Sequence, residues 1–276
     1  MKKVYISSAL ALLPLLTLFA AQIEPHKANT SNIRVVGVEP TPEGDHIETH
    51  IVFPKDGEVE GGSPVAIQVF LEGYPLGTDS DFPRRHEISN DKSGQSLHVV
   101  IDNYPYFELN EAFVTSIDDS EEYYDQILEF DIPFELSPGK HVIRAFPARS
   151  FGESLKDEGT MGVSIFYYGE ATETPGMDID QPFLTYNEPQ GTYIYSKKAP
   201  ILLDFLLTNA MPSPDGYKIR LTIDGKTVRN LVSVGPYFVY GLSLGKHTIR
   251  LELLDADNSK VPGVFNDVIQ AIRVIE

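Results

Sequence analysis

Cysteine is absent from this chain of 276 residues, so no disulfide can form and no lipid can be attached to a cysteine after export. Basic residues are also few. The chain has 22 Lys and Arg against 40 Asp and Glu, which gives a formal net charge of −18 at pH 7. Such a surface repels nucleic acid and anionic lipid headgroups. The composition therefore argues against a nucleic-acid partner and requires the fold to be held by packed cores.

Sustained 3.6-residue periodicity is missing too, so little helix is expected beyond the N-terminal segment. Apolar residues instead alternate with acidic ones from Leu128 to Leu136, and a second alternating strand is predicted from Val232 to Leu242. The nearly continuous apolar runs at 65–71 and 201–207 are typical of central strands. Twenty prolines and 21 glycines separate these segments. The pattern predicts an all-β protein built from short strands.

One segment of the chain occurs twice. Residues 136–144 read LSPGKHVIR and residues 242–250 read LSLGKHTIR, so seven of the nine residues are identical. The alignment extends beyond this segment, and its matched pairs include Pro64 with Pro200 and Asp102 with Asp224. A repeat of this length predicts two copies of one β module.

The N-terminal residues 1–21 have the pattern of a secretory signal peptide. Lys2 and Lys3 precede an apolar stretch at 9–19 that is short for a membrane-spanning helix. Cleavage is predicted beside Ala20 and Ala21, and an uncleaved N-terminal anchor is the alternative. The protein is therefore expected to be exported by a bacterium and to be periplasmic, displayed on the cell surface or secreted.

The remaining chain divides by composition. We predict a disordered lead-in at 22–31, a first module at 32–170, a linker at 171–180 and a second module at 181–276. The linker region is polar and contains proline and glycine, which permits relative motion unless the modules dock. The first module is longer because it has an insertion within 108–127 and a long connection at 73–96.

The Pro-x-x-Gly opening, the buried strand, the Leu-x-x-Gly-x-His-x-Ile corner and the closing strand resemble bacterial immunoglobulin-like and fibronectin-III-like modules. The resemblance covers most of 32–276, once per module. It implies two tandem immunoglobulin-like antiparallel β-sandwiches behind a signal helix. Neither copy has the Cys…Trp…Cys core of antibody-type domains, and the chain has no tryptophan. Such modules serve as adhesins, spacers and accessory domains, so the resemblance specifies a fold rather than a function.

Two histidines occupy the repeated corner. In these sandwiches a tyrosine at the start of strand F often reaches back to the corner backbone, and here His141 and His247 take its place. Parity with Ile143 and Ile249 points both rings inward. We predict a structural corner in which a neutral imidazole donates to a backbone carbonyl. A metal ligand or a general base is the alternative.

A candidate ligand site comes from the loops of the first module. Tyrosine and arginine anchor interfaces and stack on sugars or peptides. The candidate residues are Arg84, Arg85, Tyr104, Tyr106, Arg149 and Glu153. If the loops gather at one end of the sandwich, we expect a contact patch for a protein or glycan partner at the cell envelope. Local salt bridges between ordinary loop residues are the alternative.

Motifs of catalysis are missing from the sequence. It has no Gly-x-Ser-x-Gly elbow, no His-Glu-x-x-His and no phosphate-binding glycine loop. Ser150 and Ser154 have no partner that can be placed near them, and the acidic run at 118–125 lacks calcium-loop spacing. We therefore predict no enzyme activity, cofactor or metal, and membrane contact only through an uncleaved signal segment. A non-catalytic binding protein is the leading hypothesis, followed by a structural component of an envelope assembly and then an enzyme of unknown chemistry.

Overall fold

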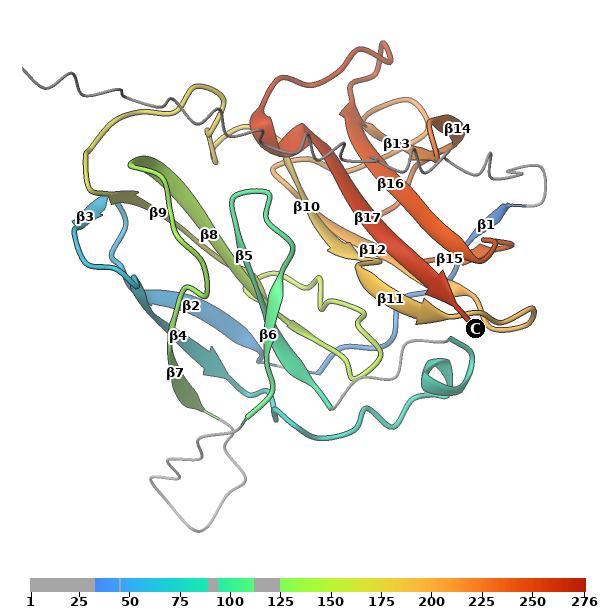
Figure 1. Cartoon of the computed structure of the whole chain (residues 1–276), viewed down its shortest axis with the longest axis horizontal. Coiled ribbons are helices and arrows are strands. Elements are labelled where there is room, and N and C mark those ends of the chain that lie inside the picture. Colours follow the sequence, from blue (N-terminus) through green and yellow to red (C-terminus); the bar gives the residue numbers. More distant parts are fainter. Residues whose placement is uncertain (1–32, 45, 89–93, 112–124) are drawn as a thin grey trace, which may run out of the picture.

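The structure, a computed structural model, describes residues 33–44, 46–88, 94–111 and 125–276. The predicted signal peptide and lead-in, and most of the acidic run, lie outside these residues. The described chain is β almost throughout, and its helices are the short 3-10 turns η2 (Pro83–His86) and η3 (Val264–Asn266). The predicted all-β class is confirmed (Figure 1). Within the described residues, no helix has the length and hydrophobicity needed to cross a bilayer.

The first sandwich packs a three-stranded sheet of order β2–β4–β7 against a five-stranded sheet of order β3–β9–β8–β5–β6. Its strands are β2 (Glu48–Phe53), β3 (Glu58–Glu60), β4 (Ala66–Glu72), β5 (Ser96–Ile101), β6 (Phe107–Leu109), β7 (Gln126–Asp131), β8 (Gly139–Ala148) and β9 (Gly162–Tyr168). Alternate residues of β4, Ile67, Val69 and Leu71, are fully buried in its core. This period-two burial is what the alternating sequence predicts.

The second sandwich repeats this plan with sheets of order β1–β15–β12–β10 and β11–β17–β16–β13–β14. Its strands are β1 (Arg34–Gly37), β10 (Phe183–Glu188), β11 (Gly191–Ile194), β12 (Ile201–Thr208), β13 (Lys218–Ile223), β14 (Lys226–Leu231), β15 (Tyr237–Tyr240), β16 (Gly245–Leu254) and β17 (Asp267–Ile275). Two pairings, β3 with β9 and β11 with β17, are parallel. The other pairings between these strands are antiparallel, as predicted, and the parallel exception occurs at the same place in both copies.

Strand β1 lies in the range predicted for the first module but pairs with β15 of the second sandwich, from Arg34 opposite Tyr240 to Gly37 opposite Tyr237. Val35 enters the second core, and its carbonyl accepts a hydrogen bond of 2.9 Å from Arg229 Nη1. The described chain thus begins in the second sandwich, crosses to the first, and later returns. The module boundaries stay a prediction. Strand β1 comes before the first sandwich in the sequence but belongs to the second sandwich in space.

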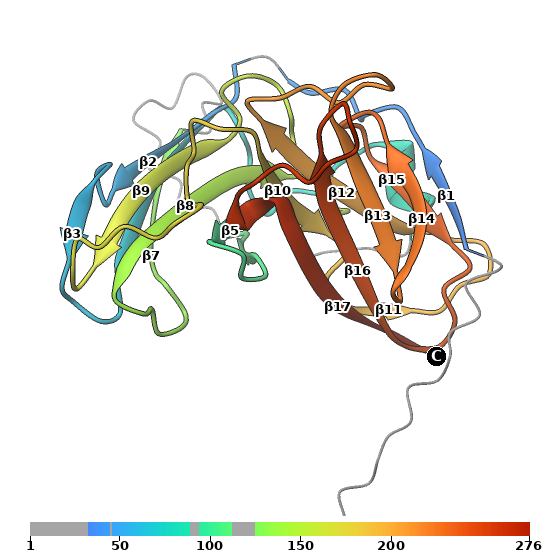
Figure 2. The same cartoon turned by 90° about the horizontal axis from the view of Figure 1, so that it is seen from above.

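The two sandwiches lie side by side and contact each other through sheet faces (Figure 2). The β5–β8–β9 face of the first packs on the β10–β12 face of the second through two apolar clusters. One cluster joins Val100 and Phe146 to Leu206, and the other joins Val142 to Phe183. Strands β5 and β10 are consequently buried on both faces. The linker therefore connects docked modules.

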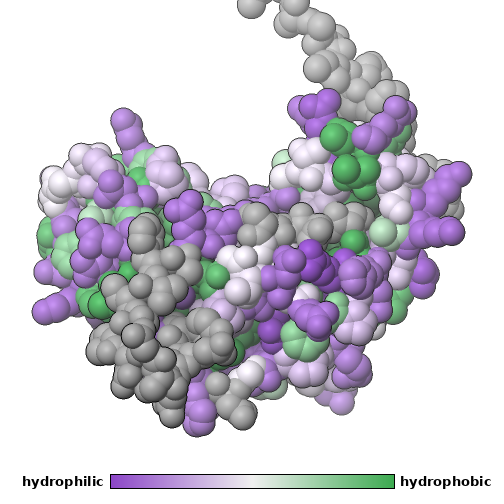
Figure 3. Space-filling view, turned by 90° about the horizontal axis from the view of Figure 1, so that it is seen from below, coloured by the Kyte–Doolittle hydropathy of each residue, from purple (hydrophilic) through white to green (hydrophobic). Residues whose placement is uncertain are grey.

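The outer surface of the molecule is mostly hydrophilic on the face shown in Figure 3, with apolar residues scattered over it. Several large apolar side chains are exposed, among them Ile127, Ile194, Met211 and Ile269. Scattered exposed apolar residues are normal on a folded protein and do not by themselves mark a site.

Candidate functional site

The repeated corner has the same geometry in both sandwiches. His141 Nδ1 donates to Asp102 Oδ2 at 2.7 Å, and Nε2 donates to the Ser137 carbonyl at 2.7 Å. The other oxygen of Asp102 accepts a hydrogen bond of 2.9 Å from Val142 N. The equivalent distances at the second corner, among His247, Asp224, Ser243 and Thr248, are 2.7, 2.8 and 3.0 Å. Both ring nitrogens of His141 face acceptors, so the geometry at this corner favours an imidazolium rather than the neutral ring predicted from sequence.

Burial acts to lower the pKa of His141, but hydrogen bonds to Asp102 and to the Ser137 carbonyl act in the opposite direction. The net effect raises the pKa of His141 above its ordinary value of 6.5. The folded protein then binds the proton more tightly than the unfolded chain does. The resulting stabilisation is complete below the unfolded pKa and is lost as the pH rises through the folded pKa.

We expect His141→Asn to lower the free energy of unfolding by about 2 kcal/mol at pH near 6, because two charge-assisted hydrogen bonds are lost. The loss should become smaller as the pH is raised through the folded pKa towards pH near 9, because the wild-type ring then loses its proton. Urea denaturation at the two pH values measures the difference. His50→Asn, on the exposed face of β2, is the control and should have little effect at either pH. Equal losses for His141→Asn at both pH values would contradict the imidazolium.

Three of the six candidate loop residues come together, around the segment that crosses between the sandwiches. Arg84 forms an ion pair with Glu153, whose side chain is 4% exposed. Glu153 also accepts hydrogen bonds from Thr41 N at 2.7 Å and Thr41 Oγ1 at 2.8 Å. Arg149 donates to the Pro42 carbonyl at 2.5 Å. These three side chains are thus engaged in holding the crossing segment.

The other three candidates lie elsewhere. Arg85 pairs with a neighbouring carboxylate. Tyr104 is about half exposed. Tyr106 is buried between the sandwiches, where its hydroxyl donates to Glu188 Oε1 at 2.6 Å and its ring stacks on His98 at 3.8 Å. The six residues therefore do not form one surface, and a ligand-binding role for them stays a prediction.

The loops that carry these arginines pack on the second sandwich. Ile88 and Phe151 form a cluster with Leu202 and Phe238 of β12 and β15, and Phe82 lies against it. Burying such side chains contributes roughly 1.5–3 kcal/mol each. Apolar residues in otherwise polar connections were the sequence signal for this docking. From the sequence we expected these connections to be free loops, so their docking on the second sandwich was not predicted.

A buried polar network joins the sandwiches around Asp204, which is fully buried. Ser154 Oγ donates to Asp204 Oδ2 at 2.5 Å, and Lys156 Nζ donates to Asp204 Oδ1 at 2.6 Å. Asn187 Nδ2 also donates to Asp204 Oδ2 at 2.7 Å, and its amide oxygen accepts from His98 Nδ1 at 2.7 Å. The serine proton and the lysine charge are both directed at a carboxylate. This arrangement holds the two modules together through hydrogen bonds and an ion pair, and it does not activate Ser154 as a nucleophile.

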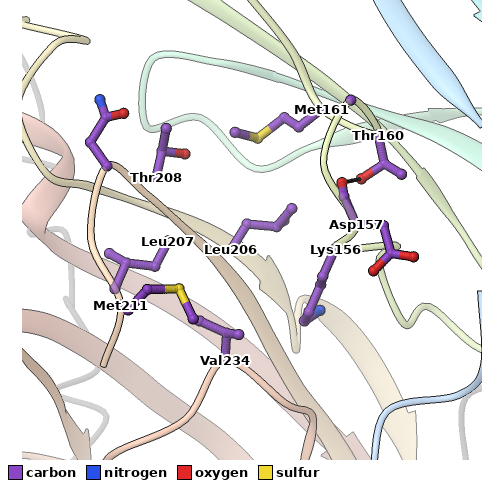
Figure 4. A pocket seen from close by; sticks show the side chains of 11 residues that line it. Lys156, Asp157, Thr160, Met161, Leu206, Leu207, Thr208, Met211 and Val234 are labelled. Atoms are coloured by element: carbon purple, nitrogen blue, oxygen red, sulfur yellow. Dashed lines mark hydrogen bonds between the residues drawn. The ribbon is translucent and has the colours of Figure 1, made fainter. Parts of the chain in front are cut away.

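A cavity of about 360 Å³ opens where the sandwiches meet, close to this network. It is bounded by Lys156, Asp157 and residues 159–161 of the first sandwich and, across from them, by the end of β12 with Met211 and Val234 (Figure 4). Met161 and Leu206 contribute apolar side chains, and Asp157 contributes a carboxylate. The volume lies in the range of small ligand sites, which are commonly apolar with a few polar groups and occur at domain junctions. Among the described residues, no group of three or more His, Asp or Glu side chains could hold a metal ion.

No protein-family model and no curated protein matches the chain. The fibronectin(III)-like modules of CbhA from Clostridium thermocellum match at 13% identity over 82% of this chain and 93% of that one, with a TM-score of 0.27. The immunoglobulin domains 1–4 of Sidekick-1 match at 14% over 86% and 51%, with a TM-score of 0.21. SGBP-B of Bacteroides ovatus, solved in complex with a mixed-linkage heptasaccharide, matches at 14% over 88% and 47%, with a TM-score of 0.18.

The chain spans about half the length of the latter two structures. At such scores and identities these matches carry no argument about function. The sequence also predicts immunoglobulin-like and fibronectin-III-like modules, and the strand order of the two sheets in each sandwich agrees with that fold. The fold assignment therefore rests on the topology described above.

Proposed function

We propose that this protein is a non-catalytic binding protein that holds its ligand in the cleft between the two sandwiches. The observation that carries the proposal is the cavity of about 360 Å³ at the module junction. Displacing water from apolar walls favours binding, and the polar groups at the rim would orient the ligand.

The cleft fits this role better than the arginine loops do. Arg84 and Arg149 are already engaged within the chain, so a ligand would have to replace their present partners. Met161 and Met211 line the cleft instead, and Met211 is 76% exposed. Methionine side chains are flexible and polarisable and are common at adaptable binding surfaces.

The expected partner and location of the protein follow from its sequence. The partner would be a protein or glycan of the cell envelope, met after export. The docked sheets and the Asp204 network would keep the walls of the cleft in a fixed relation. A site built on rigid elements loses less conformational entropy when a ligand binds.

Methionine-methyl NMR tests the proposal directly, because the chain has only 4 methionines. We expect a true ligand from a panel of peptides and oligosaccharides to shift the Met161 and Met211 methyl signals. Met177 does not line the cleft, although it packs against the same cluster around Phe183 as Met161 does, so it is the internal control and should shift less than Met161 and Met211. Shifts confined to Met177, or a ligand whose affinity is unaffected by Met211→Ser, would contradict binding in the cleft.

A further inference from the structure

We propose that this protein binds further copies of itself, head to tail, through the outer faces of its two sandwiches. The outer face of β13, β16 and β17 of one copy would pack on the outer face of β2, β4 and β7 of the next. Three features carry the proposal, and none of them depends on the cleft. They are a sheet docking that the duplication could repeat, opposite charges on the two faces, and apolar residues exposed on both.

The docking already present in the chain uses one face of each sandwich. The β5–β8–β9 face of the first packs on the β10–β12 face of the second. In the duplicated plan the β5–β8–β9 face corresponds to the β13–β16–β17 face, and the β10–β12 face corresponds to the β2–β4 face. Strands β2, β4 and β7 lie at the left of Figure 1, and β13, β16 and β17 lie at the right. The chain thus has one docked pair of faces and presents a second pair of the same kinds to other molecules.

The acidity of the protein is divided unequally between the sandwiches. Residues 48–170 carry 8 Lys and Arg against 24 Asp and Glu, whereas residues 181–276 carry 10 against 9. The net charge of −18 therefore comes almost entirely from the first sandwich and its flanking segments. Two copies arranged head to tail would bring a sandwich of high negative charge against one that is nearly neutral.

The outer face of β13, β16 and β17, which we call the basic face, carries an excess of cations. Its charged side chains are Arg220, Lys246, Arg250, Lys260 and Arg273, with the carboxylates Glu252 and Asp267. Both carboxylates are ion-paired with cations of the same face. Lys246 and Arg273 are exposed opposite each other, and neither has an ion-pair partner among the described residues. The charge available to a partner on this face is therefore positive.

The outer face of β2, β4 and β7, which we call the acidic face, has the opposite charge. Its carboxylates are Glu48, Glu72, Glu129 and Asp131. These three strands contain no lysine or arginine. Faces of opposite potential attract each other and are held in a defined orientation.

Exposed apolar side chains accompany the charges on both faces. On the basic face Ile269 is 57% exposed. It lies opposite Arg250 as Val163 lies opposite Arg144, and Val163 packs in the cluster between the docked sandwiches. On the acidic face Ile127 is 56% exposed. Burying these side chains in a contact would add a hydrophobic contribution to the charge attraction.

The duplicated arginine indicates where the faces would meet. In the docked interface Arg144 donates to Thr185 Oγ1 of β10 at 3.1 Å. The counterpart of Thr185 on β2 is His50, which is paired with the exposed Glu48. Arg250, with its side chain 32% exposed, would thus meet a carboxylate of the next copy where Arg144 meets a hydroxyl.

The size of the acidic face limits the strength of the contact. Three strands of about seven residues form a face of about 14 Å by 23 Å. Stable interfaces bury about 800 Å² on each partner, which is more than this face offers. Association should therefore be weak, should increase with protein concentration and should be strongest at low ionic strength. Because the two faces differ, the contact does not close on itself, and copies would add into linear chains.

Sedimentation velocity of the full chain over a concentration series tests the association. We expect the average mass to rise with concentration at about 0.02 M salt and to return towards the monomer at about 0.5 M. Lys246→Glu combined with Arg273→Glu removes the unpaired charges of the basic face and should weaken association at least about tenfold. Glu72→Lys combined with Asp131→Lys should do the same by reversing charge on the acidic face.

A mixture of the two double variants is the sharpest measurement, because each supplies the unaltered face that the other lacks. Each variant alone should stay monomeric at concentrations where the wild-type chain associates, and the mixture should recover association. Lys197→Glu combined with Lys198→Glu makes the same charge change in the exposed segment between β11 and β12. This control should alter association by no more than about twofold.

Several results would overturn the proposal. They are a wild-type chain that stays monomeric at every concentration, association that survives both double variants, and a mixture that does not recover. Poly-glutamate serves as a probe for a foreign acidic partner. If it binds a monomeric wild-type chain and loses affinity with Lys246→Glu and Arg273→Glu, the basic face serves such a partner and self-association is wrong.

Discussion

Arg144→Met is expected to lower the free energy of unfolding by about 3 kcal/mol, because it removes two hydrogen bonds of a buried charged group. Arg144 is 1% exposed. Its Nη1 donates to the Leu184 carbonyl and to Thr185 Oγ1, both at 3.1 Å. Burial lowers the pKa of Arg144 to about 10, so the group is still charged at neutral pH. Methionine would fill part of its volume but leave both acceptors in the interface without this donor.

The duplicated chain provides the control. Arg250 occupies the same position in the second corner segment, yet it lies on the surface with its side chain 32% exposed and paired with Asp267. Arg250→Met should therefore cost less than about 1 kcal/mol. Urea denaturation of the two variants measures both values. Equal losses would mean that the module interface contributes little to stability, and a more stable Arg144→Met protein would mean that desolvation of the guanidinium outweighs its hydrogen bonds.

Val35→Asp is expected to lower the free energy of unfolding by about 3–4 kcal/mol, because a carboxylate enters the second core without a partner. Val35 is 8% exposed and packs in the cluster that contains Tyr237 and Val239. The loss is limited to the contribution of β1 if that strand detaches. In that case amide exchange should accelerate at β15 and not at β7.

The matched control for this variant is Val59→Asp on β3. Val59 is 49% exposed, so the substitution should change stability by less than about 0.5 kcal/mol. Hydrogen exchange and urea denaturation of the full chain follow both variants. Faster exchange confined to the first sandwich in Val35→Asp would contradict the assignment of β1 to the second.

The candidate site was only partly predictable. Lys156 and the serines stand in a connection that the sequence marks as unusual, but their partner Asp204 lies in an apolar run some 50 residues away. Nothing in a period-two pattern relates a loop of one module to a strand of the other. The hydrogen bonds of the repeated corner were easier to predict from the sequence. Asp102 and Asp224 are matched in the repeat, and only their contact with the histidines required coordinates.

The sequence by itself determined the all-β class, the duplication and the inward-facing histidines, because these depend on local alternation and on repeated residues. The tertiary structure alone decided that β1 joins the second sandwich, that Arg144 is buried while Arg250 is exposed, and that a cleft opens beside β12. These features arise where two sheet faces meet. Contacts between faces join residues distant in the chain, and identical local sequences on either side of such an interface acquire different surroundings.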